Sequence, residues 1–173
     1  MTGKTLREKS NRPVIDLPRT FWDWFFDAAS LAGLSLIAGF LLRFWPVLPE
    51  TIPTHFGFSG QPDAWGSKTT LLILPLTGLV LYVILTGVGF FPHTYNYLWA
   101  ITEKNARTQY KLAQALIGCL KTEIVWLFSY MVWKTMMISL GKAEGMGKIF
   151  VIVFLGIIFG TLGLYFYCSA QAR

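Results

Sequence analysis

Two stretches of this 173-residue chain contain no charged residue, residues 69–91 and residues 149–168. Each is long enough for a helix to cross the hydrocarbon core of a bilayer, which takes about 20 residues. The composition agrees, because 54% of the residues are hydrophobic and only 14% are charged, whereas soluble domains have about 25% charged residues. The sequence therefore predicts an integral membrane protein and excludes a soluble globule.

Two further apolar segments complete a predicted all-α membrane domain, a bundle of four transmembrane helices. The first segment follows Thr20 and Asp23, which form a capping-box pattern that starts a helix, and it stops before Pro46. We expect a basic tail over residues 1–20 and one membrane domain over residues 21–173. The expected spans are residues 25–45, 69–91, 112–140 and 149–168, with an ordered extracytoplasmic loop between the first two.

The third segment differs from the other three because it carries Lys121, Glu123 and Lys134. At 3.6 residues per turn, Glu123, Tyr130 and Lys134 fall on one stripe of the helix, which we expect to face protein or water. Charges inside a membrane are usually functional. Measured along the helix, Lys121 lies at one membrane interface. Lys134 does not reach the opposite interface and falls within the hydrocarbon layer.

The net charge of +6 could suggest a partner such as nucleic acid, but the positions of the cations do not. Ten of the 15 Lys and Arg residues fall on the N-terminal side of the predicted bundle and five on the other side. Such a bias predicts that both termini are cytoplasmic and that the basic tail contacts anionic lipids. We therefore expect membrane lipids and no nucleic acid among the partners. The tail cations are Lys4, Arg7, Lys9, Arg12 and Arg19.

The loop over residues 46–68 is rich in proline and glycine, which excludes a helix there. Residues 51–58 alternate polar with apolar side chains and predict a strand or hairpin, with a turn at residues 59–63. His55 and Asp63 are the side chains most able to do chemistry. Three interpretations stay open: a hydrogen-bonded structural histidine, a general acid/base pair, and a metal site, for which too few ligands lie nearby. The sequence assigns no catalytic residue, metal or cofactor.

Part of this loop resembles a known family. Its pattern reads Leu48-Pro49-x-x-Ile52-Pro53-x-His55-Phe56-x-x-x-Gly60-x-Pro62-Asp63-x-Trp65-x-x-Lys68. It is similar to the signature of the bacterial membrane family called domain of unknown function 1648, which also occurs in the N-terminal part of the immunity protein against the sporulation-delaying toxin. The resemblance implies a bacterial inner-membrane protein and supplies no reaction. We expect a ligand-binding or partner-binding loop formed by Pro53, His55, Phe56, Gly60, Pro62, Asp63, Trp65 and Lys68.

A second block of the same resemblance follows the second predicted span. In this block Thr102 can cap a helix that begins at Glu103 and continues into the third span. Aromatic and basic side chains around it suit a membrane interface. We expect an interfacial elbow that positions the third span, with a partner-docking surface as the alternative. The residues of this cytoplasmic motif are Asn96, Tyr97, Thr102, Glu103, Asn105, Gln109 and Tyr110.

The fourth span contains Gly156, Gly160 and Gly163, a spacing of small residues that lets two helices approach closely. We expect this glycine face to pack within the bundle rather than form a dimer seam.

These features favour a non-enzymatic binding or accessory protein, either a subunit of a larger membrane complex or an immunity-type or sensor-type protein. Other membrane proteins or a second copy are the expected partners. One alternative is a small oligomeric transporter that uses Glu123, Tyr130 and Lys134. Another is a membrane enzyme that uses His55 and Asp63 at the outer surface.

Overall fold

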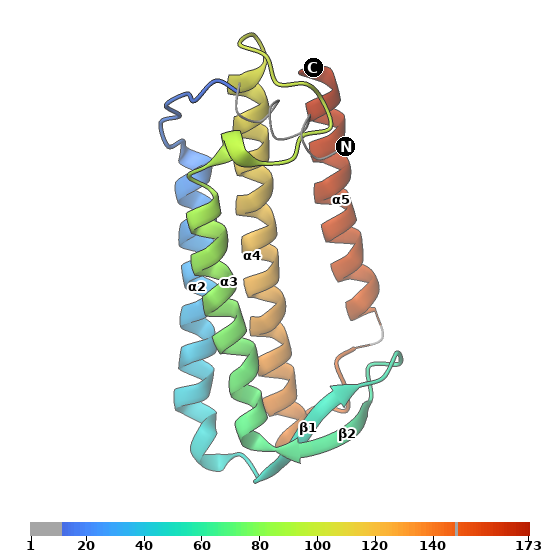
Figure 1. The fold of residues 1–173 in the computed structure, drawn as a ribbon. Helices are drawn as coiled ribbons and strands as arrows, with labels where there is room; N and C mark the ends of the chain where they lie inside the picture. Colours follow the sequence, from blue (N-terminus) through green and yellow to red (C-terminus); the bar gives the residue numbers. More distant parts are fainter. Residues whose placement is uncertain (1–11, 148) are drawn as a thin grey trace, which may run out of the picture.

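The computed structural model describes residues 12–147 and 149–173. Four long helices stand side by side, and a two-stranded hairpin closes one end of the bundle (Figure 1). The helices are α2 (Phe21–Phe44), α3 (Ile73–Val88), α4 (Ala106–Ser139) and α5 (Phe150–Gln171). The strands are β1 (Thr51–Phe56) and β2 (Pro62–Ser67), and the short 3-10 helices are η1 (Trp45–Val47), η2 (Lys68–Leu72) and η3 (Pro92–Thr94).

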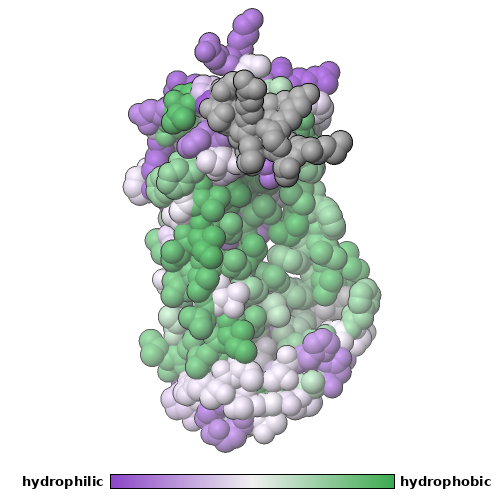
Figure 2. Space-filling model, in the orientation of Figure 1, coloured by the Kyte–Doolittle hydropathy of each residue, from purple (hydrophilic) through white to green (hydrophobic). Residues whose placement is uncertain are grey.

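The predicted fold class is confirmed. The structure contains four candidate membrane spans that are long and apolar enough to cross a bilayer, and the hairpin lies between the first two. On the face shown in Figure 2, apolar residues cover the middle of the bundle and hydrophilic residues gather at its two ends. The predicted tail residues Lys4, Arg7 and Lys9, and Lys148 between the last two spans, lie outside the described residues.

Local sequence sets where the first two spans begin. Thr20 accepts a hydrogen bond from the Asp23 amide, and the Asp23 carboxylate accepts one from the Thr20 amide at 2.6 Å, so the predicted capping box is present. Ser67 caps the second span by accepting from the Thr69 amide. This span starts as the 3-10 helix η2, and its α-helix covers only Ile73–Val88.

The predicted start of the third helix is wrong by three residues. The α4 helix begins at Ala106 and not at Glu103. The Thr102 amide donates to the Asn105 side-chain oxygen at 2.8 Å, and the Asn105 amide donates back to the Thr102 hydroxyl. These bonds close a separate turn, because short polar side chains compete with the helix for backbone groups.

The α4 helix is the central element, and α2 packs most closely against it. A Cβ atom added at Gly33 would lie 2.7 Å from Val125 Cγ1, and one added at Gly118 would lie 2.7 Å from Phe26 Cδ2. The Ser129 hydroxyl crosses the same contact and donates to the Gly33 carbonyl at 2.9 Å. Glycine at these two positions is therefore what lets the helices approach closely.

The α5 helix has its main contacts with α4 alone. The prediction that its glycine face packs within the bundle is wrong. Apart from the glycine's own chain neighbours and the adjacent backbone of α5, no heavy atom of the described residues lies within 4 Å of a Cβ added at Gly156, Gly160 or Gly163. The reason is that α5 uses other positions to reach α4, including Thr161, which donates to Glu123, and Phe150, which stacks on Tyr130.

Candidate functional site

The hairpin is fixed at both of its ends. Its strands pair antiparallel, and Ile52 on β1 is buried in an apolar cluster with residues of α2 and α4. At its tip, Gly60 has a φ angle of +78°, which glycine adopts without strain. The Gly60 carbonyl accepts a hydrogen bond from the Met146 amide at 2.8 Å, and a Cβ on Gly145 would lie 2.5 Å from that carbonyl oxygen. The hairpin tip is thus fastened to the loop between α4 and α5.

His55 and Asp63 meet across the two strands, with Nδ1 and Oδ1 2.5 Å apart. Their side chains are 70% and 50% exposed. Neither lines the nearby cavity of about 320 Å³ that Pro53 and Phe56 border. Within residues 12–147 and 149–173, no group of three His, Cys, Asp or Glu side chains could hold a metal ion. The His55–Asp63 pair therefore acts as a cross-strand contact that stabilises the pairing of β1 with β2.

The other residues of the predicted loop surface divide into buried and exposed ones. Pro53 and Gly60 are buried, and Phe56 and Pro62 are partly buried. Trp65 is exposed on β2. Lys68 pairs with Glu50 at 2.8 Å and lies over the Trp45 ring. His55, Asp63 and Trp65 therefore form the part of this set that a ligand can reach from outside.

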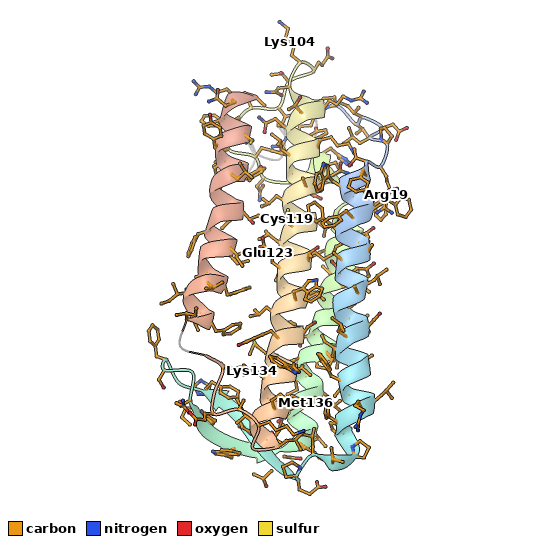
Figure 3. The ribbon with its side chains drawn as sticks, turned by 180° about the vertical axis from the view of Figure 1, so that it is seen from behind. Arg19, Lys104, Cys119, Glu123, Lys134 and Met136 are labelled. Carbon is orange, nitrogen blue, oxygen red and sulfur yellow. The ribbon has the colours of Figure 1, made fainter. Side chains whose placement is uncertain are left out.

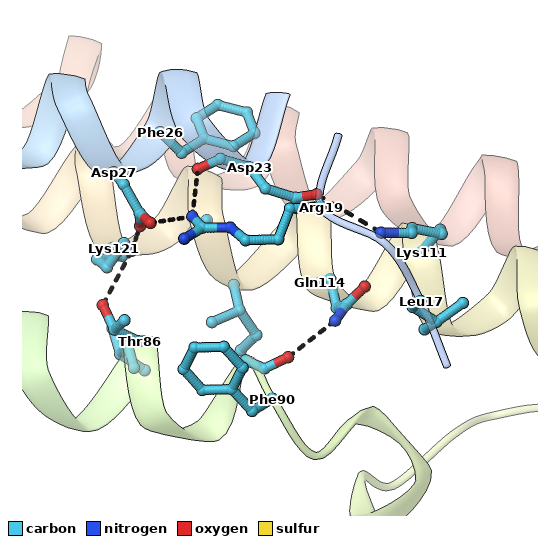
Figure 4. Close-up of a pocket in the computed structure, with 14 residues that line it drawn as sticks. Leu17, Arg19, Asp23, Phe26, Asp27, Thr86, Phe90, Lys111, Gln114 and Lys121 are labelled. Carbon is cyan, nitrogen blue, oxygen red and sulfur yellow. Dashed lines mark hydrogen bonds and ion pairs between the residues drawn. The ribbon is translucent and has the colours of Figure 1, made fainter. Parts of the chain in front are cut away.

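Lys121 does not point to the membrane surface as expected. Its side chain is 4% exposed and donates to the Asp27 carboxylate of α2 and to the Thr86 hydroxyl of α3 at 3.0 Å. The Tyr82 ring lies 4.9 Å from its ammonium group. Burial of the ammonium is possible because its charge is paired and its hydrogen bonds are satisfied. Lys121 thus joins three helices (Figure 4).

Asp27 is a functional candidate that the sequence interpretation missed. Besides Lys121, it accepts from Arg19, and its neighbour Asp23 one turn earlier faces Lys111 at 3.5 Å. These charges line a cavity between α2, α3 and α4 (Figure 4). The available signal was a carboxylate inside the first predicted span, because a buried charge needs an opposite charge.

Glu123 lies between α4 and α5 (Figure 3). One carboxylate oxygen accepts from Thr161 at 2.5 Å, and the other is buried with no partner among the described residues. The Tyr130 hydroxyl donates to the Met146 carbonyl at 2.5 Å. Lys134 lies one turn further along α4, with its ammonium 5.5 Å from the Trp133 ring. The structure thus gives the three stripe residues separate partners.

A groove of about 560 Å³ runs between α4 and α5, and almost all of its surface is apolar. Glu123 and Tyr130 line it, whereas Lys134 does not. Its apolar walls include Trp126, Phe154 and Ile157. The groove combines an apolar surface with one carboxylate, which is the composition of a site for an apolar partner that carries a polar group.

The predicted cytoplasmic motif holds chain segments together at the other end. The Gln109 side chain exchanges two hydrogen bonds with Ser169, at 2.7 and 2.8 Å, and so ties the end of α5 to α4. The Tyr110 hydroxyl donates to the Pro13 carbonyl, and the Tyr97 hydroxyl donates to the Pro92 carbonyl. Asn96 and Glu103 are exposed. These contacts fit the predicted elbow better than a docking surface.

Residues 31–79 match the protein family described as Domain of unknown function (DUF1648). The matched stretch covers the later part of α2, the whole hairpin and the start of α3. It includes the exposed hairpin residues and excludes both Lys121 and Glu123.

An uncharacterized protein from Archaeoglobus fulgidus is 53% identical to this chain over 51 residues. That stretch is 27% of this chain and 28% of the archaeal protein. The chain therefore spans less than a third of the length of this relative. No solved structure matches the chain. The match to this family and the four candidate spans of the structure support a multi-pass membrane protein, and neither names an activity.

Proposed function

We propose that the protein is a non-enzymatic accessory protein of the membrane, which receives a transmembrane helix of a partner protein in the groove between α4 and α5. The observation that carries this proposal is the second carboxylate oxygen of Glu123. It is buried at the wall of an apolar groove and has no hydrogen-bond partner among the described residues. A buried polar atom without a partner costs about 1 to 3 kcal/mol.

The depth of Glu123 indicates what kind of occupant would satisfy it. Its partner Thr161 lies at the middle of α5, which covers Phe150–Gln171. Glu123 therefore lies near the centre of the hydrocarbon layer, where lipid tails offer no hydrogen-bond donor. A neighbouring transmembrane helix can supply a donor at this depth from a serine, threonine, asparagine or tryptophan side chain. A partner of this chemistry fits the groove better than lipid alone.

The packing of α5 supports the same proposal. The helix is held at one end by Gln109 and Ser169, near its middle by Glu123 and Thr161, and at its other end by the stacking of Phe150. Between these points the groove is open. The open glycine face of α5 offers the partner a second surface of close approach.

The transporter alternative has less support. A shared path would need Glu123, Tyr130 and Lys134 to border one space, but Lys134 does not line the groove. The Tyr130 hydroxyl is engaged by the Met146 carbonyl of the adjacent loop. These contacts favour a binding role for Glu123 over a place in a conduit.

The role that we infer is that of a subunit in a larger membrane assembly, or of an immunity-type or sensor-type protein that acts on a membrane partner. We further propose that both termini are cytoplasmic, on the basis of the Lys and Arg bias. The hairpin would then face outward, with His55, Asp63 and Trp65 as its accessible surface.

Site-specific photocrosslinking in the membranes of producing cells tests the groove. A photoreactive residue at Val153, which lines the groove, should give one protein adduct whose crosslinked peptide comes from a transmembrane segment. The matched control position is Val83, an exposed residue of α3. Glu123→Leu should reduce the adduct about tenfold, since a buried donor left without its acceptor costs about 1 to 3 kcal/mol. Glu123→Gln keeps an acceptor and should retain most of it.

Three outcomes would contradict the proposal. The first is an equal yield of protein adducts at Val83. The second is an adduct that does not depend on Glu123. The third is an adduct with twice the mass of this chain, which would make the occupant a second copy instead of another protein.

A further inference from the structure

A cavity of about 90 Å³ lies between α2, α3 and α4 (Figure 4). Arg19 lines this cavity and lies toward the end of the bundle away from the hairpin (Figure 3). We propose that this cavity binds the phosphate group of an anionic phospholipid whose headgroup also carries a hydroxyl group, as in phosphatidylglycerol. The ligand and the location both differ from those of the α4–α5 groove, so this inference stands apart from the proposed function.

The cavity lies at the depth of lipid headgroups. It borders the first turns of α2, where Trp22 and Trp24 are exposed. Exposed tryptophans at a helix end mark the headgroup level of a bilayer. Leu17 and Phe90 form apolar edges of the same cavity, next to which the upper part of an acyl chain would lie.

The charges of the cavity leave one cation in excess. Arg19, Lys111 and Lys121 line it together with Asp23 and Asp27. A phosphodiester carries one negative charge and would balance this excess. Lys121 is 4% exposed and held by Asp27, whereas the Arg19 and Lys111 side chains are 37% and 25% exposed. Basic pockets between transmembrane helices bind anionic headgroups in this way.

Gln114 supplies an independent observation that points to a ligand. Its amide nitrogen donates to the Gly89 carbonyl at 2.9 Å, which fixes the orientation of the amide. Its oxygen is then buried without a hydrogen-bond partner in the part of the chain that the structure describes. Gln114 lines the cavity, so this oxygen accepts a hydrogen bond from a donor placed there.

This acceptor distinguishes between two phosphodiester lipids. The glycerol headgroup of phosphatidylglycerol has hydroxyl donors for the Gln114 oxygen. The choline headgroup of phosphatidylcholine has no N–H or O–H donor and adds a positive charge to a site that already has an excess. The cavity should therefore select phosphatidylglycerol over phosphatidylcholine, although both lipids contain the same phosphodiester.

Native mass spectrometry of the full chain in detergent tests this selection, with each lipid added in turn. We expect one tightly bound phosphatidylglycerol per chain, with an affinity at least about tenfold above that for phosphatidylcholine. Lys111→Gln and Gln114→Leu should each lower the phosphatidylglycerol affinity about tenfold, the loss expected for one hydrogen bond to a charged or buried group. Arg107→Gln is the matched control, because Arg107 is an exposed cation one turn earlier on α4 and does not line the cavity.

The remaining results would overturn the proposal. Equal binding of the two lipids would show that the protein attracts lipids without selecting a headgroup in this cavity. A loss of affinity in Arg107→Gln as large as in Lys111→Gln would show that phosphatidylglycerol is attracted only to the basic surface of the protein. A cavity of this size also holds water, and the absence of tightly bound lipid would mean that water is its occupant. Added inorganic phosphate that raises the melting temperature while phosphatidylglycerol does not would mean that free phosphate is the ligand. If Lys111→Gln does not fold, the uncharged change Gln114→Leu decides the test.

Discussion

Lys121 of α4 donates a hydrogen bond to the Asp27 carboxylate of α2, and both groups lie inside candidate membrane spans. The two residues are 94 positions apart in the sequence. The Lys121 side chain is almost fully buried, whereas Asp27 has a second cation, Arg19, whose side chain is 37% exposed. Asp27 keeps a partner when Lys121 is removed, but Lys121 has no other carboxylate partner among the described residues when Asp27 is removed. The two removals should therefore cost different amounts of stability.

Removing Asp27 should therefore destabilise the protein more than removing Lys121. Asp27→Ala leaves a buried ammonium without a counter-ion, which costs about 3 to 5 kcal/mol. Lys121→Ala leaves Asp27 paired with Arg19 and should cost clearly less. Thermal unfolding in detergent measures the stability of both variants. Arg43→Gln is the control, because Arg43 is an exposed cation of α2, the helix that carries Asp27. The double change Asp27→Leu with Lys121→Met should recover stability, because an apolar pair needs no partner charge. Equal losses in the two single variants would contradict this account.

The α2–α4 contact should not tolerate a side chain at Gly33. Gly33→Ala places a methyl group 2.7 Å from Val125 Cγ1 and should cost about 1 to 3 kcal/mol of unfolding free energy. Gly39 lies on the same helix with open space around it, so Gly39→Ala should be neutral or slightly stabilising. Adding Val125→Ala to Gly33→Ala should restore part of the loss. Similar melting temperatures for the two glycine variants would argue against the close contact.

The tip of the hairpin should detach when Gly145 is enlarged. A Cβ at this position would lie 2.5 Å from the Gly60 carbonyl oxygen, which is the acceptor of the Met146 amide. Hydrogen exchange should therefore show faster exchange of the Met146 amide in Gly145→Ala. Phe58 is 99% exposed at the same tip, so Phe58→Ala should leave that exchange unchanged. An unchanged rate in Gly145→Ala would mean that the loop and the hairpin are not in contact.

Tyr95 should ionise only at strongly alkaline pH. Burial raises the pKa of its phenol to about 12, and the hydroxyl donates to the Val88 carbonyl at 2.8 Å. Because the folded-state pKa is above the ordinary value of 10.0, the stability linked to Tyr95 is complete below pH 10 and is lost as the pH rises through 12.

Difference absorbance between the original protein and Tyr95→Phe during alkaline titration isolates this phenol. The difference signal should appear near pH 12 in the folded protein and near pH 10 in denaturant. A folded-state midpoint near pH 10 would show that Tyr95 is in contact with water.

Much of the fold could be predicted from the sequence because membrane spans and helix caps depend on neighbouring residues. The uncharged run at residues 69–91 and the capping box of Thr20 and Asp23 each indicate their structure without any knowledge of the rest of the chain. The Pro- and Gly-rich loop similarly predicts a hairpin between the first two spans. The start of α4 was misplaced because Thr102 and Asn105 bond to each other's backbone.

The candidate sites were predicted less completely. The sequence singled out His55 and Asp63, which are eight positions apart, and the structure brings them together across one hairpin. It also singled out Glu123, Tyr130 and Lys134 as one stripe, but each of them has a different neighbour. Gln114 was not identified at all, because its significance depends on an unsatisfied oxygen that only the packing around it reveals.

The sequence alone determined that the chain has four segments long and apolar enough to cross a membrane as helices, because hydrophobicity and length act along a single segment. Only the tertiary structure decided which charges meet. Lys121 pairs with Asp27, while one oxygen of Glu123 has no partner in the described residues. The glycine face of α5 also stays open, against expectation. Which buried charges pair, and which buried polar atoms find a hydrogen-bond partner, depends on how separate helices are placed in space. The periodicity along one helix does not specify that placement.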